Sequence, residues 1–173
     1  MRVLYVCNIF DNENIDKKGI VSDSPAAFVK VTSVCSALKP YVQDIEILSL
    51  GICNSKRKKI KLNDTFINEI PLRYVNKLNN KILRNLFVLF SLYRFIKKRN
   101  PEIVVFYNYT IVYFFAIVRL KLKKIKMIID IEDGVNKELG LLRFFYRSLV
   151  LNFYIKCTNG YALTVSELLG KKY

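Results

Sequence analysis

Polar side chains that could do chemistry follow several short apolar runs of this sequence. Asn8 and Asp11 come soon after one run, Asn108 ends a second, and Glu132 and Asp133 follow a third. Carboxylates and amides form hydrogen bonds with hydroxyl groups, and a carboxylate can also take up a proton from one. These residue types therefore point to a site that binds sugar hydroxyls or positions an acceptor molecule.

A structural interpretation of the same residues stays open. Asp133 can cap the helix that follows it, Asp130 can pair with a nearby lysine, and asparagines are common where a strand turns into a loop. Ser24 precedes Pro25, as is typical of a helix start, and a helix start can also bind an anion. Sequence alone does not choose between these roles.

Several catalytic classes are excluded by residues that the sequence lacks. It has no His, which excludes Ser-His-Asp or Cys-His catalysis and a His-ligated metal, and we expect no metal site. The four cysteines, at positions 7, 35, 53 and 157, form no Cys-x-x-Cys pair and are expected to be reduced and buried. The chain has six glycines, and the Gly-x-Gly-x-x-Gly fingerprint and the P-loop are both missing. We therefore expect this chain to hold no nucleotide cofactor by itself.

Positive charge is concentrated in the middle of the chain. Residues 54–126 hold 18 Lys and Arg against 3 Asp and Glu, whereas the remainder is balanced. Such a surface attracts polyanions, either nucleic acid or an anionic membrane leaflet. The residues expected to form it are Lys56, Arg57, Lys58, Lys59, Lys97, Lys98, Arg99, Lys121, Lys123 and Lys124.

Aromatic residues are frequent in the same region. They either insert into a bilayer beside the basic residues or pack in the core, and core packing is favoured for most of them. These residues are Phe87, Phe90, Tyr93, Phe95, Tyr113, Phe114 and Phe115. The longest apolar stretch, residues 103–118, contains Asn108 and Thr110 and is shorter than the ~20 residues of a spanning helix.

Short apolar runs alternate with helical patterns along the whole chain. We expect strands at 3–7, 45–48, 70–75, 103–107, 127–131 and 161–165, with polar loops at 11–23 and 53–69. Helices are expected at 25–38, 77–99, 111–122, 138–157 and from 166 onward. Strands that read as buried on both faces and alternate with helices form a parallel sheet. The sequence therefore predicts a single α/β domain, a Rossmann-like, doubly wound, mostly parallel six-stranded sheet with strand order 3-2-1-4-5-6.

That fold places the polar residues together. In a doubly wound sheet the ligand crevice lies at the carboxyl ends of the strands, where the strand order reverses between strands 1 and 4. The expected substrate-binding residues at this edge are Asn8, Phe10, Asp11, Gly19, Ser24, Asn108, Tyr109 and Glu132, with Asp133 as the expected catalytic carboxylate.

Five segments together resemble a known family. MRVLYVCNIF, SPAAFVKVTSVCSAL, RNPEIVVFYN, MIIDIEDGV and YALTVSELL resemble, in this order and spacing, the N-terminal domain of family 4 glycosyltransferases, which have the GT-B fold. The resemblance covers essentially the whole chain. It implies that Phe10, Asp11, Gly19 and Asp133 match acceptor-side positions of the family. The chain departs from the family pattern where Gly19 stands alone instead of as a pair, and where Glu132 stands in the place of a His.

The resemblance also implies a division of labour. In this family the N-terminal domain binds the acceptor, and a C-terminal domain binds the nucleotide-sugar donor and contributes a Glu-x7-Glu motif, with retention at the anomeric carbon. That motif has no match in residues 1–173, so the chain is expected to be the N-terminal half of such an enzyme, inactive alone, with the donor domain absent.

Three functions follow as hypotheses. The first is the acceptor-binding half of a glycosyltransferase of bacterial surface polysaccharide synthesis, which acts on a glycan or lipid-linked acceptor. It would be cytoplasmic, peripheral on the inner face of the plasma membrane, with its C-terminal domain and the anionic membrane as partners. The second is a non-enzymatic nucleic-acid-binding domain, which is less favoured because the basic runs alternate with aliphatic residues. A stand-alone hydrolase or dehydrogenase is disfavoured by the missing His and glycine-rich loops.

Overall fold

A computed structural model describes residues 1–18, 20–21, 25–55, 62–75, 83–132 and 141–164. Several predicted site residues lie outside these ranges, and so does the helix expected from residue 166. The site residues concerned are Gly19, Ser24, Lys56, Arg57, Lys58, Lys59 and Asp133.

The centre of the molecule is a seven-stranded sheet with the order β5-β6-β3-β1-β7-β8-β9. Six strands are parallel to their neighbours, and β5 pairs antiparallel with β6. The bounds are β1 Arg2–Cys7, β3 Asp44–Ser49, β5 Thr65–Ile67, β6 Ile70–Tyr74, β7 Ile103–Tyr107, β8 Lys126–Ile131 and β9 Ala162–Thr164. The parallel strands have the predicted order 3-2-1-4-5-6, which confirms the doubly wound fold.

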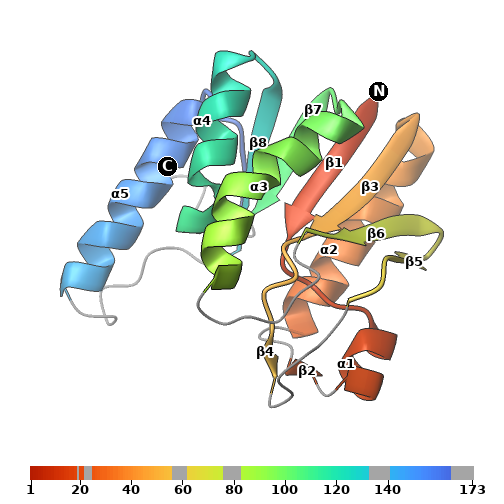
Figure 1. Ribbon diagram of the computed structural model, residues 1–173. Helices are drawn as coiled ribbons and strands as arrows, with labels where there is room; N and C mark the ends of the chain where they lie inside the picture. Colours follow the sequence, from red (N-terminus) through yellow and green to blue (C-terminus); the bar gives the residue numbers. More distant parts are fainter. Residues whose placement is uncertain (19, 22–24, 56–61, 76–82, 133–140, 165–173) are drawn as a thin grey trace.

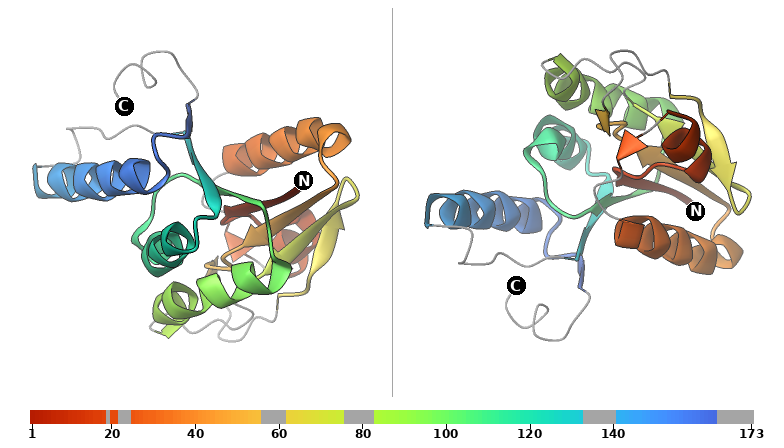
Figure 2. Two further views of the ribbon diagram at one scale, coloured as in Figure 1. Left: turned by 90° about the horizontal axis from the view of Figure 1, so that it is seen from above. Right: turned by 90° about the horizontal axis from the view of Figure 1, so that it is seen from below.

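Helices cover both faces of the sheet (Figures 1 and 2). The helices are α1 Asn12–Lys18, α2 Pro25–Leu38, α3 Leu83–Arg99, α4 Phe114–Leu122 and α5 Leu141–Cys157, with 3-10 turns η1 Lys39–Tyr41 and η2 Ile111–Tyr113. Helix α2 packs on the face that carries Tyr5 and Cys7, whereas α3, α4 and α5 pack on the face that carries Leu4 and Val6. Because successive side chains of β1 alternate between two buried faces, the strand is apolar without interruption.

Two segments that were predicted to be loops contain regular structure, and both predictions were wrong in this respect. The first polar loop holds helix α1, which begins directly after Asp11. The second loop contributes the edge strand β5 and the short strand β4 (Asn54–Ser55), which pairs antiparallel with β2 (Ile20–Val21). These elements are too short and too polar to show a periodic pattern, so long-range pairing and a helix cap decide them.

Candidate functional site

The strand order reverses between β1 and β7, and this place defines the candidate site. The chain leaves β1 toward α2 on one face of the sheet and leaves β7 toward α4 on the other face (Figure 1). In doubly wound sheets the loops that follow two such strands separate, and ligands bind at this carboxyl edge. We call this edge, with Asn8, Asn108 and Glu132 at its strand ends, the carboxyl-edge site.

The two asparagines of the site hold its loops in place. The Asn8 amide nitrogen donates to the carbonyl of Ile52 at 2.9 Å, and the Ile52 N–H donates to Asn8 Oδ1 at 3.0 Å. Asn108 has a φ of 56°, and its Oδ1 accepts a hydrogen bond of 2.9 Å from the N–H of Glu132. The turn chemistry considered for these residues is therefore present. Contact of either residue with a substrate stays a prediction.

Phe10 and Asp11 are buried beside the site. Asp11 Oδ1 accepts from the N–H of Asn14 at 2.9 Å, so it caps α1, and Oδ2 accepts from the Tyr74 hydroxyl at 2.8 Å. Burial acts to raise the pKa of Asp11, but the hydrogen bonds from Asn14 and Tyr74 outweigh it and hold the pKa below its ordinary value of 3.8. Phe10 stacks on the Tyr74 ring at 5.9 Å. Both residues join the end of β1 to β6.

A buried polar cluster lies under the site on the α2 face. Lys30 Nζ is 2.6 Å from Asp130 Oδ1, and the Tyr5 hydroxyl donates to the other carboxylate oxygen. The Lys30 ammonium also lies over the ring of Tyr107, 5.4 Å from its centre. Burial, followed by the charge of Asp130, raises the pKa of Tyr5 far above its ordinary range. The structure thus has the pairing with a lysine that the sequence suggested for Asp130.

Lys30 is the residue of this cluster that sequence reasoning missed. A signal was present, because helical spacing places Lys30 on the same side as the apolar residues Ala27, three residues before it, and Val34, four residues after it. A lysine on such a side is expected to need a buried anion. Asp130, about a hundred residues away in sequence, supplies it.

The loop after β7 is anchored to α5. The Tyr154 hydroxyl donates to the carbonyl of Thr110 at 2.7 Å, and the Arg147 guanidinium lies 5.2 Å from the centre of the Tyr109 ring. Tyr109 was predicted to bind substrate, and the structure places it between this loop and α5. Because these contacts hold the loop against α5, the position of Asn108 depends on both β7 and α5.

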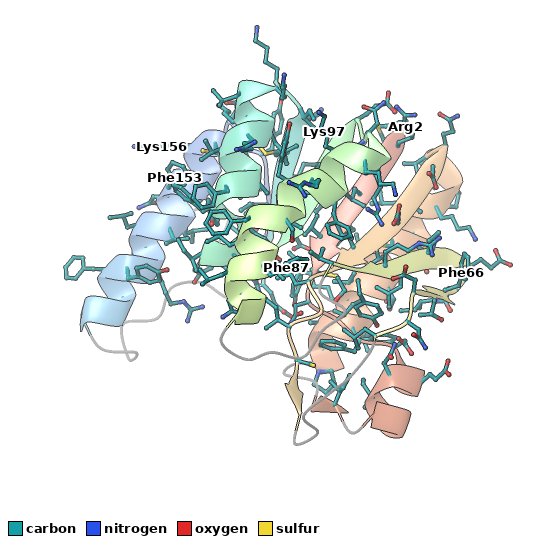
Figure 3. All side chains as sticks on the ribbon, viewed as in Figure 1. Arg2, Phe66, Phe87, Lys97, Phe153 and Lys156 are labelled. Carbon is teal, nitrogen blue, oxygen red and sulfur yellow. The ribbon has the colours of Figure 1, made fainter. Side chains whose placement is uncertain are left out.

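The lysines of the predicted anion-binding set that the structure describes lie at the opposite, amino edge of the sheet. Lys97 and Lys98 are in the last turn of α3, and Lys121 is in the last turn of α4, where parallel strands begin (Figure 3). A recess of about 450 Å³ at this edge is lined by lysines and by the turn between α5 and β9. Its lysines are Lys121, Lys124 and Lys126. Charge and candidate site are thus at different ends of the strands.

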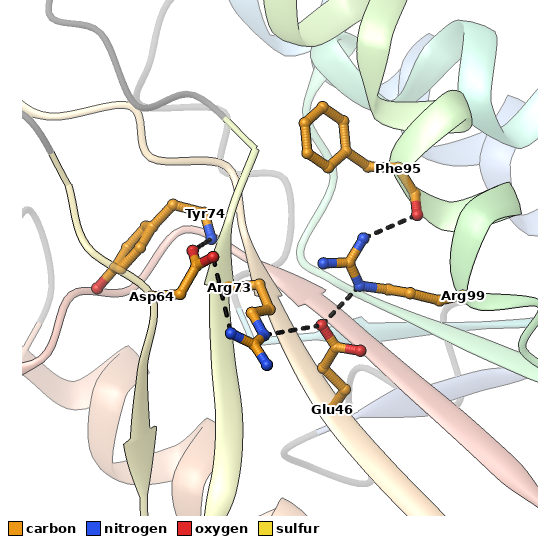
Figure 4. A network of polar contacts seen from close by, with 6 residues as sticks. All are labelled: Glu46, Asp64, Arg73, Tyr74, Phe95 and Arg99. Atoms are coloured by element: carbon orange, nitrogen blue, oxygen red, sulfur yellow. Dashed lines mark hydrogen bonds and ion pairs between the residues drawn. The ribbon is translucent and has the colours of Figure 1, made fainter.

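One predicted anion-binding residue is committed to an internal ion pair. Arg99 Nε lies 2.6 Å from Glu46 Oε1, and its guanidinium also donates to the carbonyl of Phe95 at 2.9 Å (Figure 4). Arg73 approaches the same Glu46 oxygen at 3.9 Å and reaches Asp64 at 3.7 Å. The network joins α3 to β3 and β6, so Arg99 has a structural role in this protein.

The described part of the chain contains no group of side chains suited to a metal ion and no disulfide. No group of three His, Cys, Asp or Glu side chains there could hold a metal ion. None of the four cysteines forms a disulfide. Cys7, Cys35 and Cys53 are buried, as the sequence predicted, whereas Cys157 is only partly buried, contrary to the prediction.

Comparison with known proteins identifies the fold class. No protein-family model matches the chain, and no curated protein sequence matches it significantly. The solved structures of UDP-GlcNAc 2-epimerases from Methanocaldococcus jannaschii and Rickettsia bellii are similar, with TM-scores of 0.54 and 0.55 and identities of 12% and 14%. The chain is therefore a Rossmann-like domain of the GT-B-like type, an architecture that these epimerases share with glycosyltransferases.

The match covers 97% of this chain but 40% and 39% of the two epimerase chains. The chain thus spans less than half the length of these neighbours. Within the described residues, every helix is too short or too polar to span a bilayer.

Proposed function

We propose that the chain is the acceptor-binding domain of an enzyme that transfers a sugar from a nucleotide-sugar to a glycan or a lipid-linked acceptor. The observation that carries the proposal is the carboxyl-edge site, where Asn108 holds the backbone of Glu132 beside the reversal of strand order. The enzymes with similar folds act on a nucleotide-sugar by name, which supports sugar chemistry. The donor domain lies, in this proposal, outside the 173 residues.

The proposed chemistry assigns one role to each carboxylate. Glu132 accepts hydrogen bonds from acceptor hydroxyls, and Asp133, the next residue, takes the proton of the attacking hydroxyl. The acceptor oxygen then bonds to the anomeric carbon on the same face from which the nucleotide diphosphate departs, and the diphosphate keeps the electron pair of the broken bond and stays bound to the donor domain. By the family resemblance the anomeric configuration is retained. We place the enzyme at the inner face of the plasma membrane in bacterial surface polysaccharide synthesis.

Saturation-transfer NMR with the 173-residue chain tests the acceptor role. The probes are a panel of methyl glycosides of common hexoses and N-acetylhexosamines, with UDP as the comparison. We expect signals from at least one glycoside and none from UDP. Glu132→Gln weakens that binding about tenfold, because a hydrogen bond to a charged group is lost. Glu69→Gln, which changes an exposed carboxylate on the turn between β5 and β6, serves as the matched control.

Two results would contradict the proposal. One is binding of UDP with no glycoside bound, which would make this a donor domain. The other is release of UDP from UDP-GlcNAc by the 173 residues alone, which would show that no second domain is needed.

A further inference from the structure

Large apolar side chains are exposed on the outer surfaces of α3, α4 and α5. Their exposed fractions range from 38% to 70%. Seven residues make up this outer apolar face: Leu86, Phe87 and Phe90 of α3, Phe115 of α4, and Phe145, Tyr146 and Leu149 of α5. The inner sides of the same helices, with Val88, Leu92 and Leu151 as examples, are fully buried against the sheet. These helices are therefore apolar on two sides, which core packing alone does not require.

Aromatic contacts connect the helices across the outer apolar face. The rings of Phe90 and Phe115 stack with their centres 5.1 Å apart, which joins α3 to α4 on this face. Behind the face, the partly buried Phe114 stacks on Phe153 at 5.3 Å, which joins α4 to α5. A groove of about 420 Å³ is lined by Leu86, Phe87, Phe90, Ser91 and Arg94. A connected apolar surface of this kind marks an interaction site more often than chance exposure does.

Within α3, α4 and α5 as the structure describes them, every charged side chain is basic. Helices α3, α4 and α5 contain no Asp or Glu, and between residues 70 and 129 the one carboxylate is Glu102, which lies 3.7 Å from the amino terminus of the chain. The exposed side of α3 continues from Phe87 and Phe90 to Arg94, Lys97 and Lys98. Figure 3 shows Phe87 and Lys97 toward opposite ends of this helix.

The chemistry of this surface favours one partner. An anionic bilayer offers an apolar layer to Phe and Leu side chains and phosphate groups to the cations beside them. A nucleic acid offers the phosphates, but it has no apolar layer for Leu86 or Leu149. A protein partner would commonly be matched by charges of both signs at the rim.

We propose that the outer apolar face docks on a bilayer of acidic phospholipids, with α3, α4 and α5 lying along the surface. Phe87, Phe90 and Phe115 enter the boundary between headgroups and acyl chains, and Arg94, Lys97 and Lys98 contact the headgroup phosphates. The carboxyl-edge site then opens sideways at the height of the headgroups, where a lipid-linked acceptor would present its sugar. This inference refines the peripheral location proposed above, but docking itself does not depend on which sugar reaction takes place.

The absence of Trp from the sequence gives the test a clean reporter. Phe90→Trp places the single Trp of the chain on the outer apolar face, and Phe66→Trp places one on strand β5. The two native side chains are 66% and 63% exposed, so the variants are matched. With vesicles of phosphatidylglycerol and phosphatidylcholine, emission of Phe90→Trp shifts to the blue and is quenched by brominated lipid. Emission of Phe66→Trp stays unchanged.

Vesicle sedimentation of variants separates the contribution of apolar burial to binding from that of the basic residues. Phe87→Ser in the otherwise unchanged chain lowers the partition coefficient about tenfold through lost apolar burial. Lys97→Gln combined with Lys98→Gln lowers it about tenfold through lost headgroup contacts, and 0.5 M salt weakens the native chain similarly. Because all three side chains point outward, circular dichroism of the variants stays native. Binding that no variant and no salt changes would overturn the proposal.

Further measurements distinguish a membrane partner from a nucleic acid. Equal blue shifts in the two Trp variants, or no shift with phosphatidylglycerol vesicles, would contradict docking through this face. Nanomolar binding to single-stranded DNA without vesicle binding would replace the membrane by a nucleic acid. Since none of these assays contains a sugar, their outcome is independent of the glycoside test.

Discussion

Individual side chains under the carboxyl-edge site carry most of its polar organisation. Asp130 is almost completely buried and has two partners, Lys30 and Tyr5, which come from different elements. A carboxylate in such a place is tolerated only if its partners compensate for lost hydration. The cluster therefore fixes α2 against β1 and β8, directly below the loops that we propose to bind the acceptor.

Removal of one partner of this ion pair is expected to be costly. Lys30→Met leaves Asp130 buried without its cation and lowers the free energy of unfolding by about 3 kcal/mol. The double variant Lys30→Met, Asp130→Asn recovers part of the loss, because the remaining groups are neutral. Urea denaturation measures both values.

The chain offers a matched control for this prediction. Lys39 and Glu69 also lie 2.6 Å apart, but Glu69 is exposed, so Lys39→Met leaves the unfolding free energy nearly unchanged. Equal losses in Lys30→Met and Lys39→Met would show that burial does not strengthen the first pair.

At the scale of elements, helix α1 shows how one residue creates structure in a polar segment. The seven residues of α1 have no apolar stripe, and Asp11 caps the helix and accepts from Tyr74 of β6. The residue that sequence reasoning assigned to acceptor binding thus also connects α1 with the sheet.

The stability of the protein at low pH is expected to depend on the hydrogen bonds that Asp11 accepts from Asn14 and Tyr74. The pKa of Asp11 is held below 3.8 by the hydrogen bonds, despite burial, so the ionised form stabilises the fold. That contribution is present above pH 3.8 and is lost as the pH falls through the lowered folded-state pKa. Asp11→Asn, which keeps a good capping residue, is therefore less stable than the native chain at pH 7. The difference shrinks toward pH 3, as urea denaturation at the two pH values would measure. A constant difference would argue against the ionised carboxylate.

At the scale of the whole molecule, the layer between α2 and the sheet encloses Cys7 and Cys35. Burial, then the charge of Asp130, raises the pKa of Cys35 to about 12, and Cys7 is equally enclosed. A raised pKa favours the folded state below the ordinary value of 9.0, and this advantage is lost as the pH rises from 9 toward 12.

Thiol labelling at pH 8 measures this protection. We expect Cys157, which is partly exposed, to react quickly with a disulfide reagent, and the three buried cysteines to react only through unfolding. Mass spectrometry of the labelled chain identifies the sites. Rapid labelling of Cys35 in the folded chain, at a rate like that of Cys157, would contradict the packing of α2.

The sequence by itself determined the parallel sheet, its strand order and the concentration of positive charge. Apolar runs buried on both faces, as in residues 103–107, are local patterns that the sequence shows directly. Six such strands alternating with helices predicted the order 3-2-1-4-5-6 of a doubly wound sheet. The polar strand ends were also predictable, because turns follow strands. What the pattern did not contain was pairing between residues far apart in sequence.

Only the tertiary structure decided the partners and the outward directions of side chains. Lys30 pairs with Asp130, and Arg99, which was predicted to bind anions, pairs with Glu46. Phe90 faces solvent, whereas Tyr113 is buried. Each of these outcomes depends on which helix packs at which angle on the sheet, and local propensity does not encode that angle. Composition sets how much charge and apolar surface the molecule has, and packing sets which part of it remains free to meet a partner.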